Sequence, residues 1–130
     1  MERMAVDDLI THHEDEIGDV ILHYDTAGSG PPVVLLHGLP QTLYEWRDVF
    51  PGLADRFTVI APDLRGLGVS SRPLKGYDKL TVANDVLRLV CEKLGHSTFH
   101  LVELTEFGIP VLDFTAICQV DLELPSQFVP

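Results

Sequence analysis

The feature that most limits the fold is a pair of continuous apolar runs with a short mixed segment between them. The runs are "VVLLH" (33–37) and "RFTVIAPD" (56–63), and the segment between them is "TLYEWRDVF" (42–50). Unbroken aliphatic and β-branched runs of this length are typical of parallel strands that helices cover on both faces. The middle segment is predicted to be a short helix that ends before Pro51, because a proline disfavours helix at the residue before it. The order strand, helix, strand therefore predicts a parallel sheet.

Three further segments extend this alternation. "VILHY" (20–24) and "FHLVEL" (99–104) are short β-rich runs, and "VANDVLRLVCEKLG" (82–95) repeats its apolar residues at helical spacing. Thr81 is predicted to cap that helix and Gly95 to end it. The pattern predicts one α/β domain with a mostly parallel sheet and flanking helices.

The chain is acidic, and the acidic residues gather at its two ends. It has 20 acidic and 9 basic side chains, which give a formal net charge of -11. A charge of this sign repels a nucleic-acid backbone and an anionic membrane surface, so neither is expected as a partner. No Lys or Arg follows Lys93. Residues 1–19 are therefore interpreted as an acidic N-terminal segment, and residues 103–130 as a divergent tail.

The cysteines and the apolar runs indicate in which cellular compartment the protein is expected. Cys91 and Cys118 are far apart and lack CxxC spacing, which favours two buried thiols over a disulfide. The N-terminus lacks the apolar core of a signal peptide, and no apolar run approaches the roughly 20 residues that cross a bilayer. A cytoplasmic protein is predicted.

The stretch "HHEDE" (12–16) bunches residue types that bind metals. It is not an HExxH motif, and adjacent side chains on a flexible acidic end seldom converge on one ion. The stretch is interpreted as a solvated end, and no metal is expected.

Candidate functional residues are expected in the loops at the carboxyl ends of the strands, where α/β sheets of this kind bind ligands. Those ends carry "HGLPQ" (37–41), "APDLRGLG" (61–68) and "LTEFG" (104–108). In the first loop, Gly38 lets the backbone approach a ligand closely and leaves the Leu39 N–H able to point at developing negative charge.

Neighbouring residues are assigned supporting roles. Asp63 and Arg65 are interpreted as scaffold that pairs or binds loop amides. Tyr44 and Trp46 lie two residues apart and cannot share one side of a helix. Trp46 is interpreted as a core residue, with pocket lining as the alternative.

These motifs together resemble one family. Over about residues 20–102, an HGxP loop, a downstream YEWR and a DLRGxGxSxxP segment resemble α/β-hydrolases, and within them epoxide hydrolases. The resemblance implies a truncated α/β-hydrolase fold without a cap domain, no cofactor, and a small-molecule substrate. The family reaction is hydrolysis of an epoxide to a diol through a carboxylate ester. The implied oxyanion and substrate-binding residues are His37, Gly38, Leu39, Pro40, Trp46 and Phe107.

Two relatives of this family differ at diagnostic positions. Haloalkane dehalogenases usually place Asn after His-Gly, and fluoroacetate dehalogenases place Arg after the nucleophile. This chain has Leu39 and Phe107 at those positions, so the epoxide-hydrolase resemblance is the better fit.

The resemblance fails at the nucleophile turn, where the family has a small-x-nucleophile-x-small pattern and relatives like this chain have Asp. Counting forward from Val102 places Thr105 at the nucleophile, whereas counting back from "FGIPV" (107–111) places Glu106 there. Glu106 is the better candidate, because Gly108 then fills the second small position. Glutamate is one methylene longer than Asp, however, and a solvated surface glutamate is the plainer interpretation. The stretch is read as a damaged turn, with a frame change or truncation in the gene as one hypothesis.

The remaining catalytic parts of the family follow the nucleophile, and this sequence has no His after His100. The 130 residues are therefore interpreted as one incomplete domain, inactive or weak by itself. The alternative is a non-catalytic binding or assembly module, in which the open edge of strand 99–104 pairs with another chain.

Overall fold

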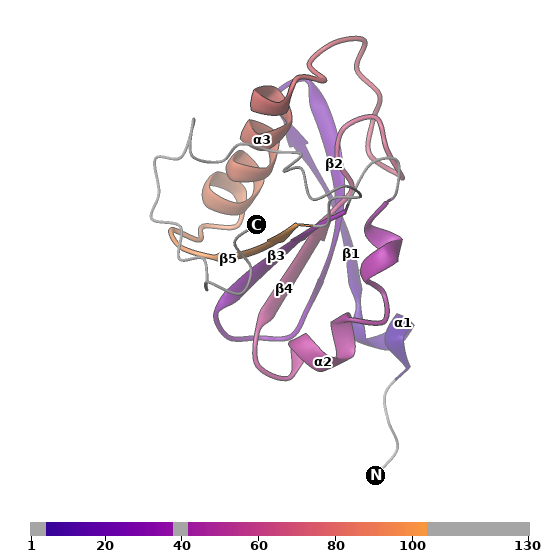
Figure 1. Ribbon diagram of the computed structural model, residues 1–130, viewed down its shortest axis with the longest axis vertical. Helices are drawn as coiled ribbons and strands as arrows, with labels where there is room; N and C mark the ends of the chain where they lie inside the picture. Colours follow the sequence, from indigo (N-terminus) through magenta and orange to yellow (C-terminus); the bar gives the residue numbers. More distant parts are fainter. Residues whose placement is uncertain (1–4, 38–41, 104–130) are drawn as a thin grey trace.

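The computed structural model describes residues 5–37 and 42–103. Figure 1 shows a sheet with helices on both sides. The elements in chain order are α1 (Val6–Leu9), β1 (Thr11–Ile17), β2 (Val20–Ala27), β3 (Pro32–Leu36), η1 (Leu43–Trp46), α2 (Phe50–Ala54), β4 (Thr58–Pro62), α3 (Lys79–Leu87), η2 (Arg88–Lys93) and β5 (His100–Glu103).

The sheet has the strand order β1-β2-β4-β3-β5. β3 pairs in parallel with β4 and β5, and β2 runs antiparallel to both β1 and β4. Four strands therefore share one direction and β2 opposes them, which confirms the predicted α/β fold with a mostly parallel sheet. The described part of the chain contains no cap domain.

Two apolar layers cover the sheet, one on each face. Along β3, Val34 and Leu36 pack in the layer with α3, whereas Val33 and Leu35 pack in the layer with η1 and α2. All four side chains are buried. This explains the unbroken apolar run, because alternate side chains of a strand point to opposite faces.

The helix predicted over residues 42–50 is divided into two shorter elements. The 3-10 helix η1 begins after Thr42, whose side chain accepts a hydrogen bond from the Tyr44 N–H. The helix α2 then includes Pro51 in its first turn instead of ending before it. The prediction was wrong here because the first turn of a helix needs no intrahelical N–H bond, so proline is accepted there.

The helix predicted over residues 82–95 begins earlier and has a different cap. The Asp78 carboxylate, rather than Thr81, is the cap: it accepts hydrogen bonds from the Thr81 N–H at 3.0 Å and from the Thr81 hydroxyl at 2.8 Å. The helix α3 widens into the π-helix η2 after Leu87. Gly95 follows with a φ of +77°, which agrees with its predicted role in ending the helix.

The acidic stretch 12–16 is a strand rather than a flexible end. It lies in β1, which forms an antiparallel hairpin with β2 around the turn at Gly18. Gly18 has a φ of +60°, the conformation that tight hairpin turns require. The sequence did not reveal this strand because its alternation is carried by His and acidic residues rather than by apolar ones. No helix within the described ranges is long and apolar enough to cross a membrane.

Candidate functional site

The carboxyl ends of the three neighbouring parallel strands lie at one edge of the sheet. Val33 pairs with Val59 of β4 and with His100 of β5, so the three strands are aligned side by side. The residues that leave this edge are His37 after β3 and Asp63 after β4. In folds of this type, ligands bind at such an edge.

His37 joins two of these strand ends. The residue is 1% exposed, and its Nε2 accepts a hydrogen bond from the Leu64 N–H at 3.0 Å. A neutral imidazole that accepts at Nε2 carries its hydrogen on Nδ1, which fixes the tautomer. The bond ties the end of β3 to the segment after β4. It therefore fixes the position from which the HGLP loop starts.

Asp63 joins the segment that follows this loop to the turn after β4. One carboxylate oxygen accepts a hydrogen bond from the Leu43 N–H at 2.8 Å, and the other accepts from the Val69 N–H at 2.9 Å. The residue is 2% exposed, so both bonds are shielded from water. Asp63 thus binds loop amides, one of the two roles expected for it.

The approach of Asp63 to this turn requires glycine. Gly68 has a φ of +56°, and a Cβ added there would lie 2.2 Å from Asp63 Oδ2. A side chain at this position would both strain the backbone and displace the carboxylate. The second glycine of "GLG" therefore serves the scaffold.

Two serines attach the same turn to β2. The Ser70 hydroxyl donates to the Asp63 carbonyl at 2.6 Å and accepts from the His23 N–H at 2.9 Å. The Ser71 hydroxyl accepts from the Ile21 N–H at 2.8 Å. Sequence reasoning assigned these serines no role, although the SxxP part of the motif contained them.

Arg65 pairs with acidic residues on both sides rather than with Asp63. Its Nε and Nη2 donate to the two oxygens of Asp85 at 2.7 and 2.8 Å, and Nη2 also donates to Asp19 at 2.9 Å. Asp85, and after it Asp19, raise the pKa of Arg65 further above its ordinary value. Burial raises the pKa of Asp85, whereas the hydrogen bond from Arg65 lowers the pKa of the exposed Asp19. Arg65 thereby fastens the turn to α3 and to the β1–β2 hairpin.

Trp46 lies in the core layer beside α2 and is 5% exposed. Tyr44, two residues earlier, is 67% exposed, with the Arg47 guanidinium 5.5 Å from its ring centre. The core interpretation of Trp46 is confirmed, and its alternative role as a pocket residue stays a prediction. The indole Nε1 of Trp46 is buried without a hydrogen-bond partner among the described residues.

The remaining candidate residues lie outside the described ranges. They are Gly38, Leu39 and Pro40 in the first loop, and Thr105, Glu106 and Phe107 in the proposed nucleophile turn. The oxyanion and nucleophile assignments therefore stay predictions. What the structure places is the frame made by His37, Asp63 and the turn after β4.

Comparison with known proteins identifies the family. A family profile described as the alpha/beta hydrolase fold matches residues 31–102, which is more than half of the chain. This chain belongs to the α/β-hydrolase fold family. The match covers β3 through most of β5, and it includes the frame built on His37 and Asp63.

Individual enzymes also resemble part of the chain. A soluble epoxide hydrolase from Corynebacterium sp. (strain C12) is 63% identical over 81 residues, covering 62% of this chain and 28% of that protein. A fluoroacetate dehalogenase from Burkholderia sp. is 42% identical over 92 residues, covering 67% of this chain and 30% of that protein. The ligand-free structure of epoxide hydrolase CorEH matches with a TM-score of 0.69 and 56% identity, over 72% of this chain and 32% of that one.

The chain therefore spans less than a third of the length of the curated relatives it matches. The resemblance to epoxide hydrolases is confirmed as a resemblance to the N-terminal part of such enzymes.

Proposed function

We propose that this chain supplies the N-terminal half of the catalytic domain of an epoxide-hydrolase-like enzyme. The observation that carries the proposal is the 63% identity to the Corynebacterium soluble epoxide hydrolase over 81 residues, together with the HGLP and DLRGLG segments inside the family match over residues 31–102. In this proposal the half contributes the oxyanion loop, and the other catalytic groups come from sequence that corresponds to the rest of that relative.

The described geometry supports the first part of this role. The His37–Leu64 bond and the Leu43–Asp63 bond hold the described residues on either side of the loop that contains Leu39. A backbone N–H stabilises an oxyanion only when it is held in place before the reaction, because it then needs no reorganisation. We infer that the Leu39 N–H is the oxyanion donor and that the buried frame fixes its direction.

The chemistry also requires groups that these 130 residues do not provide in the family pattern. Epoxide opening through an ester needs a carboxylate nucleophile, an acid for the oxygen, and a base that activates water. Glu106 is the candidate nucleophile, but no His follows His100 to act as the base. The polypeptide of this sequence is accordingly proposed to be inactive or weak when it is alone.

Turnover of a small aryl epoxide by the folded, size-purified chain tests that statement. We expect no diol above the substrate-only control, and no difference between the wild type and Glu106→Ala. Diol formation that is lost in Glu106→Ala would instead establish a working turn. The same result would show that these residues activate water by another route.

A second function is favoured by the position of β5. Among the described strands, β5 is the outermost on its side of the sheet, and it pairs only with β3. An open strand edge can pair with another chain through backbone hydrogen bonds. In this alternative the chain is a non-catalytic assembly module that self-associates through β5.

Sedimentation velocity at several concentrations separates the two functions. Edge pairing predicts a fraction of dimer that rises with protein concentration. A strictly monomeric chain would contradict the assembly module and leave the half-enzyme proposal standing.

We also propose a cytosolic location. It is supported by the wide separation of Cys91 and Cys118 and by their lack of CxxC spacing. Cys91 is half-buried beside the α3 core layer. Localisation of a tagged full-length protein by fractionation tests it.

A further inference from the structure

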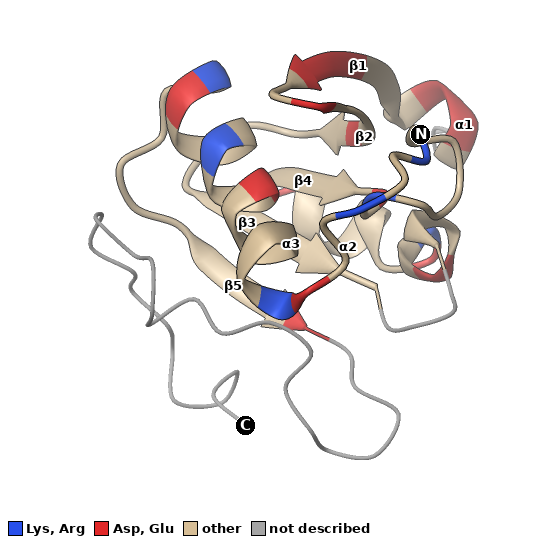
Figure 2. Cartoon of the chain, turned by 90° about the horizontal axis from the view of Figure 1, so that it is seen from above, with Lys and Arg blue, Asp and Glu red and all other residues tan. Residues whose placement is uncertain are grey.

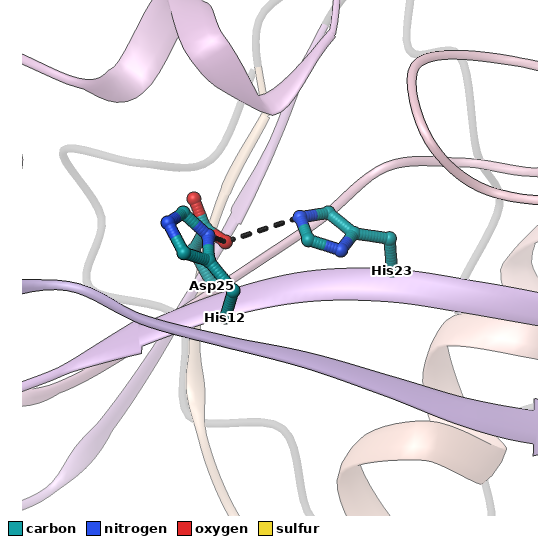
Figure 3. A group of neighbouring side chains, drawn as sticks. All are labelled: His12, His23 and Asp25. Carbon is teal, nitrogen blue, oxygen red and sulfur yellow. Dashed lines mark hydrogen bonds and ion pairs between the residues drawn. The ribbon is translucent and has the colours of Figure 1, made fainter.

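Three metal-binding side chains converge on the β1–β2 hairpin. His12 belongs to β1, and His23 and Asp25 belong to β2 (Figure 3). The strand register places His12 directly opposite Asp25. Residues two apart on a strand point to the same face, so His23 and Asp25 share the face that His12 also occupies.

The distances between the ligand atoms are short. His12 Nδ1 lies 2.5 Å from Asp25 Oδ1, and His23 Nε2 lies 3.2 Å from the same oxygen. All three ligand atoms lie within 4.8 Å of one another. Two ring nitrogens thus point at one carboxylate oxygen, from elements whose backbones are held by the sheet.

The three side chains differ in their exposure to solvent. The side chain of Asp25 is 5% exposed, that of His23 is 13% exposed, and that of His12 is 64% exposed. The carboxylate is therefore shielded from water, while the outermost imidazole remains open to solvent. An ion can reach the group from the side of His12.

We propose that His12 Nδ1, His23 Nε2 and Asp25 Oδ1 bind a divalent transition-metal ion, with Zn²⁺ as the preferred ion. Two imidazole nitrogens and one carboxylate oxygen form a ligand set that suits zinc and leaves one position for water. In a tetrahedral zinc site the ligand atoms lie roughly 3.3 Å apart, given metal–ligand bonds of about 2.0–2.1 Å. The His23–Asp25 spacing of 3.2 Å is close to that value, and the His12–Asp25 spacing of 2.5 Å would have to widen, which a rotation of the exposed His12 ring allows.

The charge of the surroundings favours a cation. The hairpin edge carries the acidic side chains of β1, and Figure 2 shows segments in the colour of Asp and Glu on this strand and on α1. Glu14 lies opposite His23 in the register, on the same face as the proposed ligands. Together with the net charge of -11, these groups raise the local concentration of cations.

The proposal differs from the interpretation of residues 12–16 as a segment without a metal role. That interpretation considered only whether neighbours along the chain could converge. The proposed ligands instead come from two strands, and only His12 belongs to the stretch. Bound zinc would join the outermost described strand on this side, β1, to β2.

Calorimetric titration of Zn²⁺ into the full chain tests the site, using protein with any affinity tag removed and metal stripped by a chelator. His13→Ala is the matched control, because His13 lies on the other face of β1, bonds to Thr26 Oγ1 at 2.8 Å and stacks on Tyr24. We expect one ion per chain in the wild type and in His13→Ala. His12→Ala should weaken binding at least tenfold. Because His12 is exposed, this variant should fold.

Two calorimetric results would overturn the proposal. One is the absence of binding to a folded wild-type chain, and the other is an equal loss of affinity in His12→Ala and His13→Ala. Co²⁺ provides an independent readout: a tetrahedral site gives an intense visible absorption, expected in the wild type and in His13→Ala and lost in His12→Ala. A spectrum that stays that of the hydrated ion would also reject the site.

Discussion

The imidazole Nε2 of His37 accepts a hydrogen bond from the Leu64 N–H at 3.0 Å, and both groups are buried. This bond connects the end of β3 with the segment after β4, across 27 residues of sequence. Because the HGLP loop starts at His37, its first residue is held by the sheet rather than by local turn chemistry alone.

Replacement of His37 should therefore lower the free energy of unfolding. His37→Leu keeps much of the volume but leaves the buried Leu64 N–H without its acceptor, which costs about 1–3 kcal/mol. Urea denaturation measures the change. His37→Gln, which retains a side-chain acceptor, is expected to lose less, and an equal loss in both variants would contradict the role of the bond.

A methyl group at Gly68 should destabilise the turn that Asp63 holds. Gly68→Ala places a Cβ 2.2 Å from Asp63 Oδ2 at a φ of +56°. The strain alone is expected to cost about 1–2 kcal/mol. Gly52→Ala is the matched control, since nothing lies within 4 Å of a Cβ at Gly52 in α2. That control should be neutral or stabilising by about 0.5–1 kcal/mol in thermal unfolding. Similar melting temperatures for the two variants would refute the prediction.

The buried pair of Arg65 and Asp85 should show strong coupling. Asp85→Leu leaves the guanidinium of Arg65 without its main partner, and such a break costs about 3–5 kcal/mol. Arg65→Met together with Asp85→Leu should cost clearly less than the sum of the two single changes, because neither charge is then left buried alone. Additive losses in a double-mutant cycle would mean that the ion pair does not act as a unit.

Low pH should destabilise the start of α3, because it protonates the capping carboxylate of Asp78. The Thr81 hydroxyl, and after it the Thr81 N–H, hold the pKa of Asp78 below its ordinary value of 3.8. A carboxyl whose folded pKa is depressed adds stability above its unfolded pKa and loses it as the pH falls through the folded value. Asp78→Ser keeps a capping oxygen but does not titrate. The wild type should therefore lose more stability than Asp78→Ser between neutral pH and about pH 2.5, as followed by thermal melts. If the stabilities of the wild type and of Asp78→Ser changed equally with pH, the cap would not depend on the charge of Asp78.

The sheet could be predicted from sequence because its central strands are buried on both faces. Val33 and Leu35 serve one core layer and Val34 and Leu36 the other, so the run reads as continuous and apolar. β1 could not be found in this way, since it lies at the edge of the described sheet and its outward residues are charged. An edge strand of this kind is identified by its pairing with the neighbouring strand, because its own residues show no apolar alternation.

The motifs of the candidate site could be predicted from the sequence, but the hydrogen bonds and ion pairs between its residues could not. The HGLP and DLRGLG segments were recognised as strand-end loops, whereas the partners of Arg65 are brought in from Asp85 and Asp19 by the tertiary fold. The group of His12, His23 and Asp25 could not be predicted for the same reason. Its members come from two strands, and only the register shows that they meet.

The central claim is the proposal that this chain supplies the N-terminal half of an epoxide-hydrolase-like catalytic domain, with its oxyanion loop. The most direct measurement is turnover of a small aryl epoxide by a chimera that joins residues 1–102 to the part of the Corynebacterium soluble epoxide hydrolase that follows the matching region. We predict diol formation by the chimera and none by the 130-residue chain alone. A chimera that folds, as judged by size and circular dichroism, yet forms no diol while the Corynebacterium enzyme does, would contradict the claim.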